Sequence, residues 1–135
     1  MDRLPRPAAR RPKRGRLSRS AEFERVYRQG RSHGNRFLVL YTFPRGDARP
    51  GELTEGPRLG VSVGRKVGGA VERNRVKRLL REAFCAAGAK LPADHDVVVV
   101  ARPEAGELAE REGLAGVQDA LDELIAKALA DEARR

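Results

Sequence analysis

Residues 65–84 read RKVGGAVERNRVKRLLREAF, and this stretch predicts how the rest of the chain is organised. Its second half has the period of an amphipathic helix, since apolar residues recur at i, i+3, i+4, i+7 and i+8. These residues are Val76, Leu79, Leu80, Ala83 and Phe84. At about 100° per residue, the polar residues between them fall on the opposite arc of the helix. One face can therefore be buried while the other presents fixed positive charges.

The charges of this helix indicate a polyanionic partner. The stretch holds seven cationic side chains and two acidic ones. Like charges three or four positions apart on a helix repel each other, so a helix that only had to be soluble would interleave acids, as residues 117–132 do. We therefore expect this face to contact nucleic acid. Its arginines favour bidentate contacts with phosphate.

The composition of the whole chain agrees with this expectation. The 135 residues carry a formal net charge of +9 with a pI near 10.7, which is typical of nucleic-acid binding. Residues 1–36 hold twelve Lys/Arg against three Asp/Glu, whereas residues 103–135 hold nine Asp/Glu against four Lys/Arg. The polyanion should therefore meet the N-terminal half and the central helix. The longest apolar run, residues 97–101, is too short to span a membrane.

The length and composition favour one domain with two tails. We expect residues 1–15 to be a disordered Arg/Pro-rich tail, which either solubilises the protein or binds phosphates. Residues 16–130 should form a single RNA-binding domain, and residues 131–135 a C-terminal tail. The single cysteine, Cys85, forms no internal disulfide and fits a reducing cytoplasm. Its expected state is an inert thiol.

Periodicity predicts three helices and three strands. Ser18 or Ser20 can cap a helix that runs to about Gln29, the basic helix ends near Gly88, and a third helix starts near Gly116. The predicted strands are residues 36–43, 58–64 and 94–102. In the first, alternation places Phe37, Val39, Tyr41 and Phe43 on one face and Leu38, Leu40 and Thr42 on the other. In the second, the face of Gly60, Ser62 and Gly64 lacks bulk, so either another backbone or a helix can pack closely there. This order predicts an α+β fold with a mixed sheet.

No catalytic group is visible in the sequence. His33 and His95 have no nucleophile beside them, so we expect ordinary surface histidines, and they form no metal site with Cys85 at any standard spacing. Three aromatic residues could instead stack on unpaired bases, which favours RNA over DNA. They are Phe23, Tyr27 and Tyr41. The spacing of Phe23 and Tyr27 also fits core packing.

The motif in the basic helix resembles a known family. Residues 70–71 and 73–82 read AV and RNRVKRLLRE, which closely resembles the RNR signature of the bacterial ribonuclease P protein subunit. The resemblance continues outside the helix and covers about residues 16–130. It includes Leu17, Phe23, Tyr27 and Gly30 in the first helix, residues 35–36 and 39–41, residues 59–63 with Lys66 and Gly68, and residues 96–100 with Arg102.

The resemblance implies a fold as well as a function. The implied fold is a two-layer α/β sandwich like the second domain of ribosomal protein S5, with about four strands in the order α-β-β-β-α-β-α. The family's βαβ crossover around the basic helix is left-handed. General handedness rules predict the opposite, since such crossovers are right-handed in about 98% of cases.

The implied function is that of a small subunit paired with a catalytic RNA in an endonuclease that removes the 5′ leader of precursor tRNA. The RNA carries the chemistry and holds most of the required Mg²⁺, so no catalytic or metal-binding side chain is expected in the protein. By resemblance, the catalytic RNA meets Arg65, Lys66, Arg73, Asn74, Arg75, Lys77, Arg78 and Arg81. The single-stranded leader is expected in a cleft formed by Phe23, Tyr27, Tyr41 and Ser62.

Three other functions fit parts of the sequence. A ribosomal or chaperone-like RNA-binding protein would use the same basic helix without a leader cleft. A free-standing nuclease is disfavoured because no carboxylates cluster. A role on a membrane surface is disfavoured because the apolar stripe of the basic helix is needed for the core. Neither a membrane nor a small-molecule substrate is expected.

Overall fold

The computed structural model describes residues 20–44 and 57–134, and these form three helices on a four-stranded sheet. The expected α+β class and element order are confirmed. The elements are α1 (Ser20–Gln29), β1 (Arg31–Gly34), β2 (Leu38–Pro44), β3 (Arg58–Val63), the 3₁₀ turn η2 (Arg65–Val67), α2 (Ala70–Ala87), the 3₁₀ turn η3 (Gly88–Lys90), β4 (His95–Ala101) and α3 (Glu104–Ala133).

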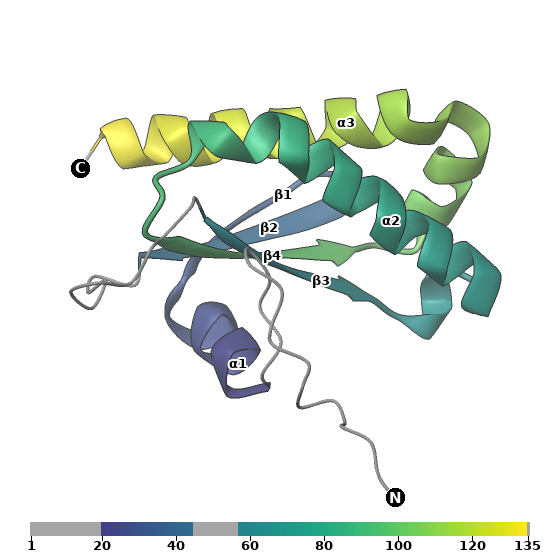
Figure 1. Cartoon of the computed structure of the whole chain (residues 1–135), viewed down its shortest axis with the longest axis horizontal. Helices are drawn as coiled ribbons and strands as arrows, with labels where there is room; N and C mark the ends of the chain where they lie inside the picture. The colour runs from purple at the N-terminus through teal and green to yellow at the C-terminus, as the bar shows by residue number, and fades with distance from the viewer. Residues whose placement is uncertain (1–19, 45–56, 135) are drawn as a thin grey trace, which may run out of the picture.

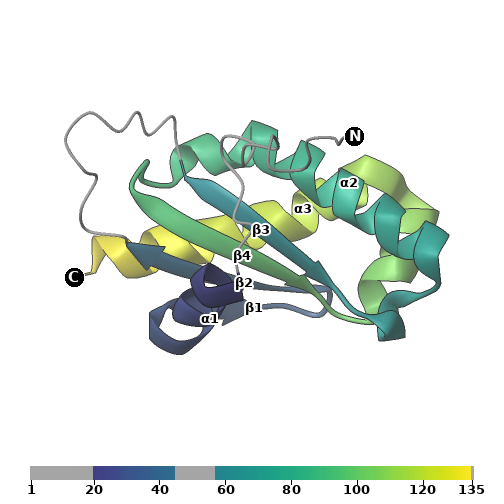
Figure 2. The ribbon, with the colours of Figure 1, turned by 60° about the horizontal axis from the view of Figure 1, so that its bottom comes forward.

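The sheet is mixed, with the spatial order β1-β2-β4-β3. β1 pairs antiparallel with β2, β2 pairs antiparallel with β4, and β3 lies parallel to β4 at the edge. Figures 1 and 2 show α2 and α3 side by side on one face of the sheet and α1 on the other. The strand β4, one of the two inner strands, is therefore covered on both sides, which explains its run of four valines.

The β3–α2–β4 connection has the unusual hand that the family resemblance implied. In Figure 1, α2 lies in front of the sheet, β3 runs from left to right, and β4 lies above β3 in the same direction. A right-handed crossover would place β4 below β3 in this view. The crossover is therefore left-handed.

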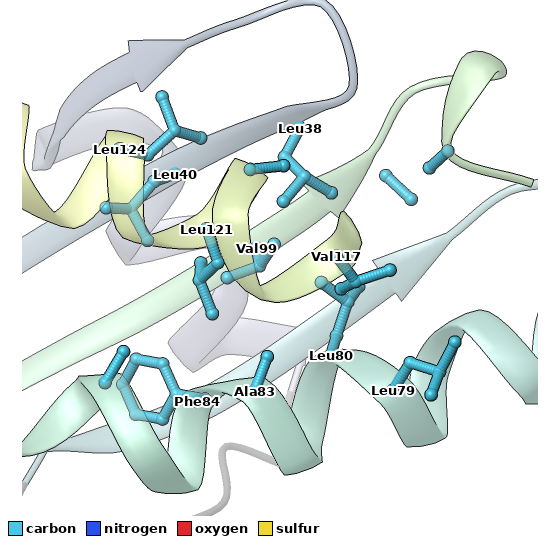
Figure 3. Close-up of a cluster of buried hydrophobic side chains, with 14 of the residues drawn as sticks. Leu38, Leu40, Leu79, Leu80, Ala83, Phe84, Val99, Val117, Leu121 and Leu124 are labelled. Atoms are coloured by element: carbon cyan, nitrogen blue, oxygen red, sulfur yellow. The ribbon is translucent and has the colours of Figure 1, made fainter. Parts of the chain in front are cut away.

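The main core lies between the sheet and the pair α2 and α3. All five residues of the predicted apolar stripe of α2 are buried in it, and Leu80 and Ala83 have no exposed surface. Figure 3 shows the side chains of Leu80 and Ala83 directed toward Leu121 and Val117 of α3 and Val99 of β4. A smaller cluster on the opposite face of the sheet contains Val26 of α1 and Val98 of β4. The helical periodicity therefore identified the buried face of α2 correctly.

Two of the expected strand features differ in the structure. The strand expected from residue 36 begins at Leu38, and Phe37 packs against the main core instead of sharing a face with Tyr41. The reason is a local turn, in which Asn35 Oδ1 accepts hydrogen bonds from the backbone N–H groups of Phe37 (3.0 Å) and Leu38 (2.9 Å). The short strand β1, which carries no alternating apolar pattern, was not predicted from residue periodicity.

The C-terminal helix is longer than its periodicity suggested. It begins at Glu104 and not near Gly116, and the backbone leaves helical geometry at Gly113 (φ 62°, ψ −147°). Two helical segments therefore meet at Gly113, and only the second carries the apolar repeat that was expected. The helix runs to Ala133, past the expected domain boundary at residue 130. The expected N-terminal tail and Ser18 lie outside the described residues.

Candidate nucleic-acid interface

The local sequence explains why α2 presents its cations outward. The helix starts after Gly69, which is extended, and its apolar stripe is held against the sheet and α3. The cationic residues of α2 and Asn74, together with two cations of η2, form what we call the basic face. Its members are Arg65, Lys66, Arg73, Asn74, Arg75, Lys77, Arg78 and Arg81. All eight residues keep some exposed surface. Four of them are exposed and the other four are half-buried; the exposed ones are Arg65, Lys66, Asn74 and Arg78.

Most cations of the basic face form no ion pair within the described part of the chain. Among the described residues, no ion pair involves Arg65, Lys66, Arg75, Lys77 or Arg78. On α3, by contrast, the cations lie beside acids of the same helix, in the pairs Arg111–Glu107 (3.7 Å) and Lys127–Glu123 (3.4 Å). The donors of these five residues are therefore available to an external anion, whereas the cations of these two α3 pairs are locally neutralised.

Three aromatic rings gather where α1 crosses the other face of the sheet. The rings of Tyr27 and Tyr41 meet edge to face, with centroids 4.9 Å apart and planes at 76°. Phe23 and Tyr27 form a second edge-to-face pair at 6.4 Å and 63°. Tyr27 is 39% exposed, whereas Phe23 and Tyr41 are half-buried against Val26 and Val98. Phe23 thus contributes to packing, and Tyr27 offers an open ring.

The small residues of β3 make room for α1. A Cβ atom on Gly60 would lie 2.5 Å from Cζ of Phe23, so only glycine lets the ring sit this close to the strand. Of the two alternatives for this face, a helix is the element that packs there. Ser62 lies two residues further along the same face and is half-exposed. We call Phe23, Tyr27, Tyr41 and Ser62 the aromatic surface.

The basic face and the aromatic surface belong to opposite layers of the molecule. α2 lies on one face of the sheet and α1 on the other, as Figure 2 shows, and β3 is the edge strand beneath α2. η2 continues directly from the end of β3, so Arg65 and Lys66 follow the strand that carries Ser62. The structure thus brings the three rings together, with Ser62 on the same face of the sheet, and separately places the eight residues predicted for the catalytic RNA along η2 and α2. The edge strand β3 connects the two sets.

A network that sequence reasoning missed fastens α1 to the sheet. Arg58 binds Asp96 through two hydrogen bonds, Nε to Oδ1 at 2.8 Å and Nη2 to Oδ2 at 2.9 Å, and its Nη1 donates to Glu22 Oε2 at 3.1 Å. The hydrogen bonds from Arg58 to Asp96 raise the pKa of Arg58, burial opposes this, and the charges of Asp96 and Glu22 add to it. The charge of Arg58 is therefore lost only at strongly alkaline pH. Arg58 and Asp96 are register partners in the parallel pair β3–β4, which no local pattern reveals.

The histidines do not lie as expected. His95 is only 4% exposed, with Nδ1 3.0 Å from Asp94 Oδ1 and Nε2 3.5 Å from Glu132 Oε2. His33 is half-buried, with Nε2 3.4 Å from Asp131. The prediction of surface histidines was wrong because α3 extends far enough for its last turns to cover both rings. Both histidines therefore join the C-terminal end of α3 to the sheet.

The described residues contain no group of three or more His, Cys, Asp or Glu side chains that could hold a metal ion. Cys85 is exposed on α2. None of the described helices is long and apolar enough to span a lipid bilayer.

Comparison with known proteins gives a consistent result. The family model for ribonuclease P matches residues 12–128. A ribonuclease P protein component from Bacillus pumilus is 44% identical over 96 residues, which cover 71% of this chain and 76% of that protein. The component from Shouchella clausii is 40% identical over 113 residues, 84% of each chain.

Solved structures extend the similarity to the fold. The RNase P protein of Staphylococcus aureus matches with a TM-score of 0.72 and 32% identity, over 86% of this chain and 96% of that one. The RNase P protein of Thermotoga maritima matches with a TM-score of 0.70 and 31% identity, over 84% of this chain and 97% of that one.

Proposed function

The chain belongs to the ribonuclease P protein family, and from this premise we propose that it binds the catalytic RNA through the basic face and the 5′ leader of precursor tRNA through the aromatic surface. One observation carries the proposal. Five cations of the basic face have no acidic partner among the described residues, and the edge strand beneath them carries the small residues of a surface lined with rings. Such a molecule can contact two nucleic-acid strands at once.

On the basic face, the proposed contacts are with phosphates of the catalytic RNA. Arginine forms bidentate hydrogen bonds with phosphate, and each phosphate that is neutralised releases counterions. Arg75 and Arg78 are separated by one helical turn, and neither forms an ion pair with an acid in the part of the chain that the structure describes. Asn74 can add a neutral hydrogen bond beside them.

On the aromatic surface, the proposed contacts are with unpaired bases of the leader. The open ring of Tyr27 is the proposed stacking platform, and Tyr41 fixes its orientation through their edge-to-face contact. Stacking of a base on an aromatic side chain contributes about 1–3 kcal/mol and tolerates any base. Ser62 offers a hydroxyl without filling the space beside the rings.

The proposed role in cleavage is indirect. By reducing phosphate repulsion where two RNAs meet and by holding the leader, the protein raises the population of the productive geometry. The chemistry is assigned to the RNA, which would also hold most of the Mg²⁺ required. We assign no step of the reaction to a metal held by the protein. The proposed location is the cytoplasm.

The test is cleavage of precursor tRNA by the cognate RNA at low Mg²⁺ concentration, with and without the protein. We expect the protein to restore cleavage that the RNA alone does not support. A second assay measures the affinity of the protein–RNA complex for precursor and mature tRNA. Tyr27→Ala should lower the affinity for leader-bearing precursor about tenfold, as expected for the loss of one stacked base, and leave the affinity for mature tRNA unchanged. Tyr27→Phe should retain the wild-type affinity because it keeps the ring.

Two results would contradict the proposal. If Tyr27→Ala lowers the affinity for precursor and for mature tRNA equally, the result would favour a general RNA-binding protein of the ribosomal or chaperone-like kind. Cleavage by purified protein free of RNA would favour a free-standing nuclease.

A further inference from the structure

The short helix α1 depends on a few contacts for its position. It has ten residues, and isolated helices below about 12–15 residues are marginal in water. Val26 is its one buried residue, and Phe23 is half-buried beside it. Tyr27 belongs to this helix, so the orientation of the proposed stacking ring depends on what stops α1 from rolling on the sheet.

The helix contacts three strands along its width. Val26 packs on Val98 of the central strand β4, and Tyr27 meets Tyr41 of β2 on one side. On the other side, Glu22 pairs with Arg58 of β3 at 3.1 Å. At about 100° per residue, Glu22 and Tyr27 lie about 140° apart around the helix, with the buried residues between them. The two edges of α1 are therefore fastened to strands on either side of β4.

Glu22 has a rigid partner in Arg58. The carboxylate of Asp96 has no exposed surface and holds Arg58 through two short hydrogen bonds, so one Arg58 N–H group is fixed in the direction of α1. Among the described residues, Glu22–Arg58 is the one ion pair that joins α1 to another element, since Glu24 pairs with Arg28 within the helix.

We propose that Glu22 is a positioning residue for leader recognition: held by Arg58 and Asp96, it stops α1 from rolling and keeps Tyr27 edge-on to Tyr41. The inference rests on the proposed function, because it assigns a role within the leader-binding surface. It is unusual in one respect. An acidic side chain supports the binding of a polyanion, although its own charge repels phosphate.

This property allows a matched experiment with two variants of the full-length protein in complex with its RNA. Glu22→Ala and Glu24→Ala each remove one negative charge from α1, but only Glu22 contacts the sheet. For Glu22→Ala we expect the affinity for leader-bearing precursor tRNA to fall about three- to tenfold, the size expected from losing one half-buried charged hydrogen bond. Mature tRNA and the catalytic RNA should bind as before. Glu24→Ala should keep or slightly raise the precursor affinity, because it removes a charge that repels phosphate and breaks only an exposed ion pair within α1.

Two further measurements separate positioning from loss of fold. Glu22→Gln keeps an oxygen that can accept from Arg58, so its precursor affinity should lie between those of the wild type and Glu22→Ala. Amide hydrogen exchange in Glu22→Ala should accelerate in α1 and stay unchanged in α2 and α3, because these helices lie on the other face of the sheet and the main core is not touched.

The outcomes distinguish this inference from the proposed function. If Glu22→Ala keeps the wild-type affinity for precursor while Tyr27→Ala lowers it, Glu22 does not position the ring. The proposal that the aromatic surface binds the leader would then remain valid. If neither variant loses precursor affinity, the aromatic surface is not the leader site and both proposals fail. An equal loss in Glu22→Ala and Glu24→Ala would also overturn the positioning role.

Discussion

Replacement of Arg75 and Arg78 together by glutamine tests whether the basic face contacts RNA phosphates. Both side chains lie on the outward arc of α2 and have no acidic partner among the described residues, so their removal leaves no buried charge unpaired. Each phosphate contact contributes roughly 0.7–0.9 to the slope of log affinity against log salt concentration. The double variant should therefore lower that slope by about 1.4–1.8.

The same figures give the expected loss of affinity. If counterion release is the whole effect, the variant and the wild type converge near 1 M salt, and at about 0.1 M salt the variant binds the catalytic RNA roughly 25- to 60-fold more weakly. Filter binding or fluorescence anisotropy over a series of salt concentrations measures both quantities. Glutamine keeps the length and polarity of the side chain, so the apolar stripe of α2 should stay packed.

The matched control removes two charges from the acidic helix. Arg111→Gln with Lys127→Gln changes the net charge by the same amount, but both cations lie beside glutamates of α3. We expect no change in slope for this variant. An equal decrease of the slope in both double variants would show that net charge and not the basic face governs binding. An unchanged slope in the α2 variant would refute the assignment of RNA contacts to this face.

Three further predictions concern the fold that supports these surfaces. Gly60→Val places a side chain within 2.5 Å of the Phe23 ring, so α1 must shift, and we expect weaker binding of leader-bearing precursor with unchanged binding of mature tRNA, measured side by side. Leu80→Ala removes a side chain with no exposed surface from the main core, which should lower the free energy of unfolding, measured by urea denaturation, by about 2–5 kcal/mol. A loss below about 1 kcal/mol would contradict the burial of Leu80 in the main core. Gly113→Ala places a side chain at a backbone geometry that favours glycine (φ 62°), and the new Cβ has no neighbouring side chain or other contact within 4 Å. A loss of about 1–3 kcal/mol in the free energy of unfolding would therefore come from backbone strain alone. An unchanged free energy of unfolding would show that the helix does not need this bend.

The local patterns of the sequence predicted the helix that carries the basic face. The spacing of Val76, Leu80 and Ala83 fixed which side of α2 is buried, and the charges between them fixed what the other side presents. Both properties depend on residues within two helical turns, so they can be found without knowing the fold. The same reasoning failed for Phe37, because a hydrogen-bonded turn at Asn35 interrupts the alternation.

Contacts between distant segments could not be found in this way. The sequence around His95 predicted a surface residue, but the last turn of α3 covers it through Glu132, which is 37 positions later in the chain. Arg58 and Asp96 meet only because β3 and β4 pair in parallel in one register, and Glu22 joins them only because α1 lies on that side of the sheet. A one-residue shift in this pairing would place Arg58 and Asp96 on opposite faces of the sheet.

By itself, then, the sequence determined a helix with one apolar and one cationic side, a set of aromatic side chains and, by resemblance, the family. The tertiary structure alone decided that the cations and the rings lie on opposite faces of the sheet with β3 at the edge between them, and that Glu22 is tied to Arg58. The physical reason is the range of the interactions. Periodicity records which side of an element avoids water, whereas layer, register and partner are set by the packing of all elements together.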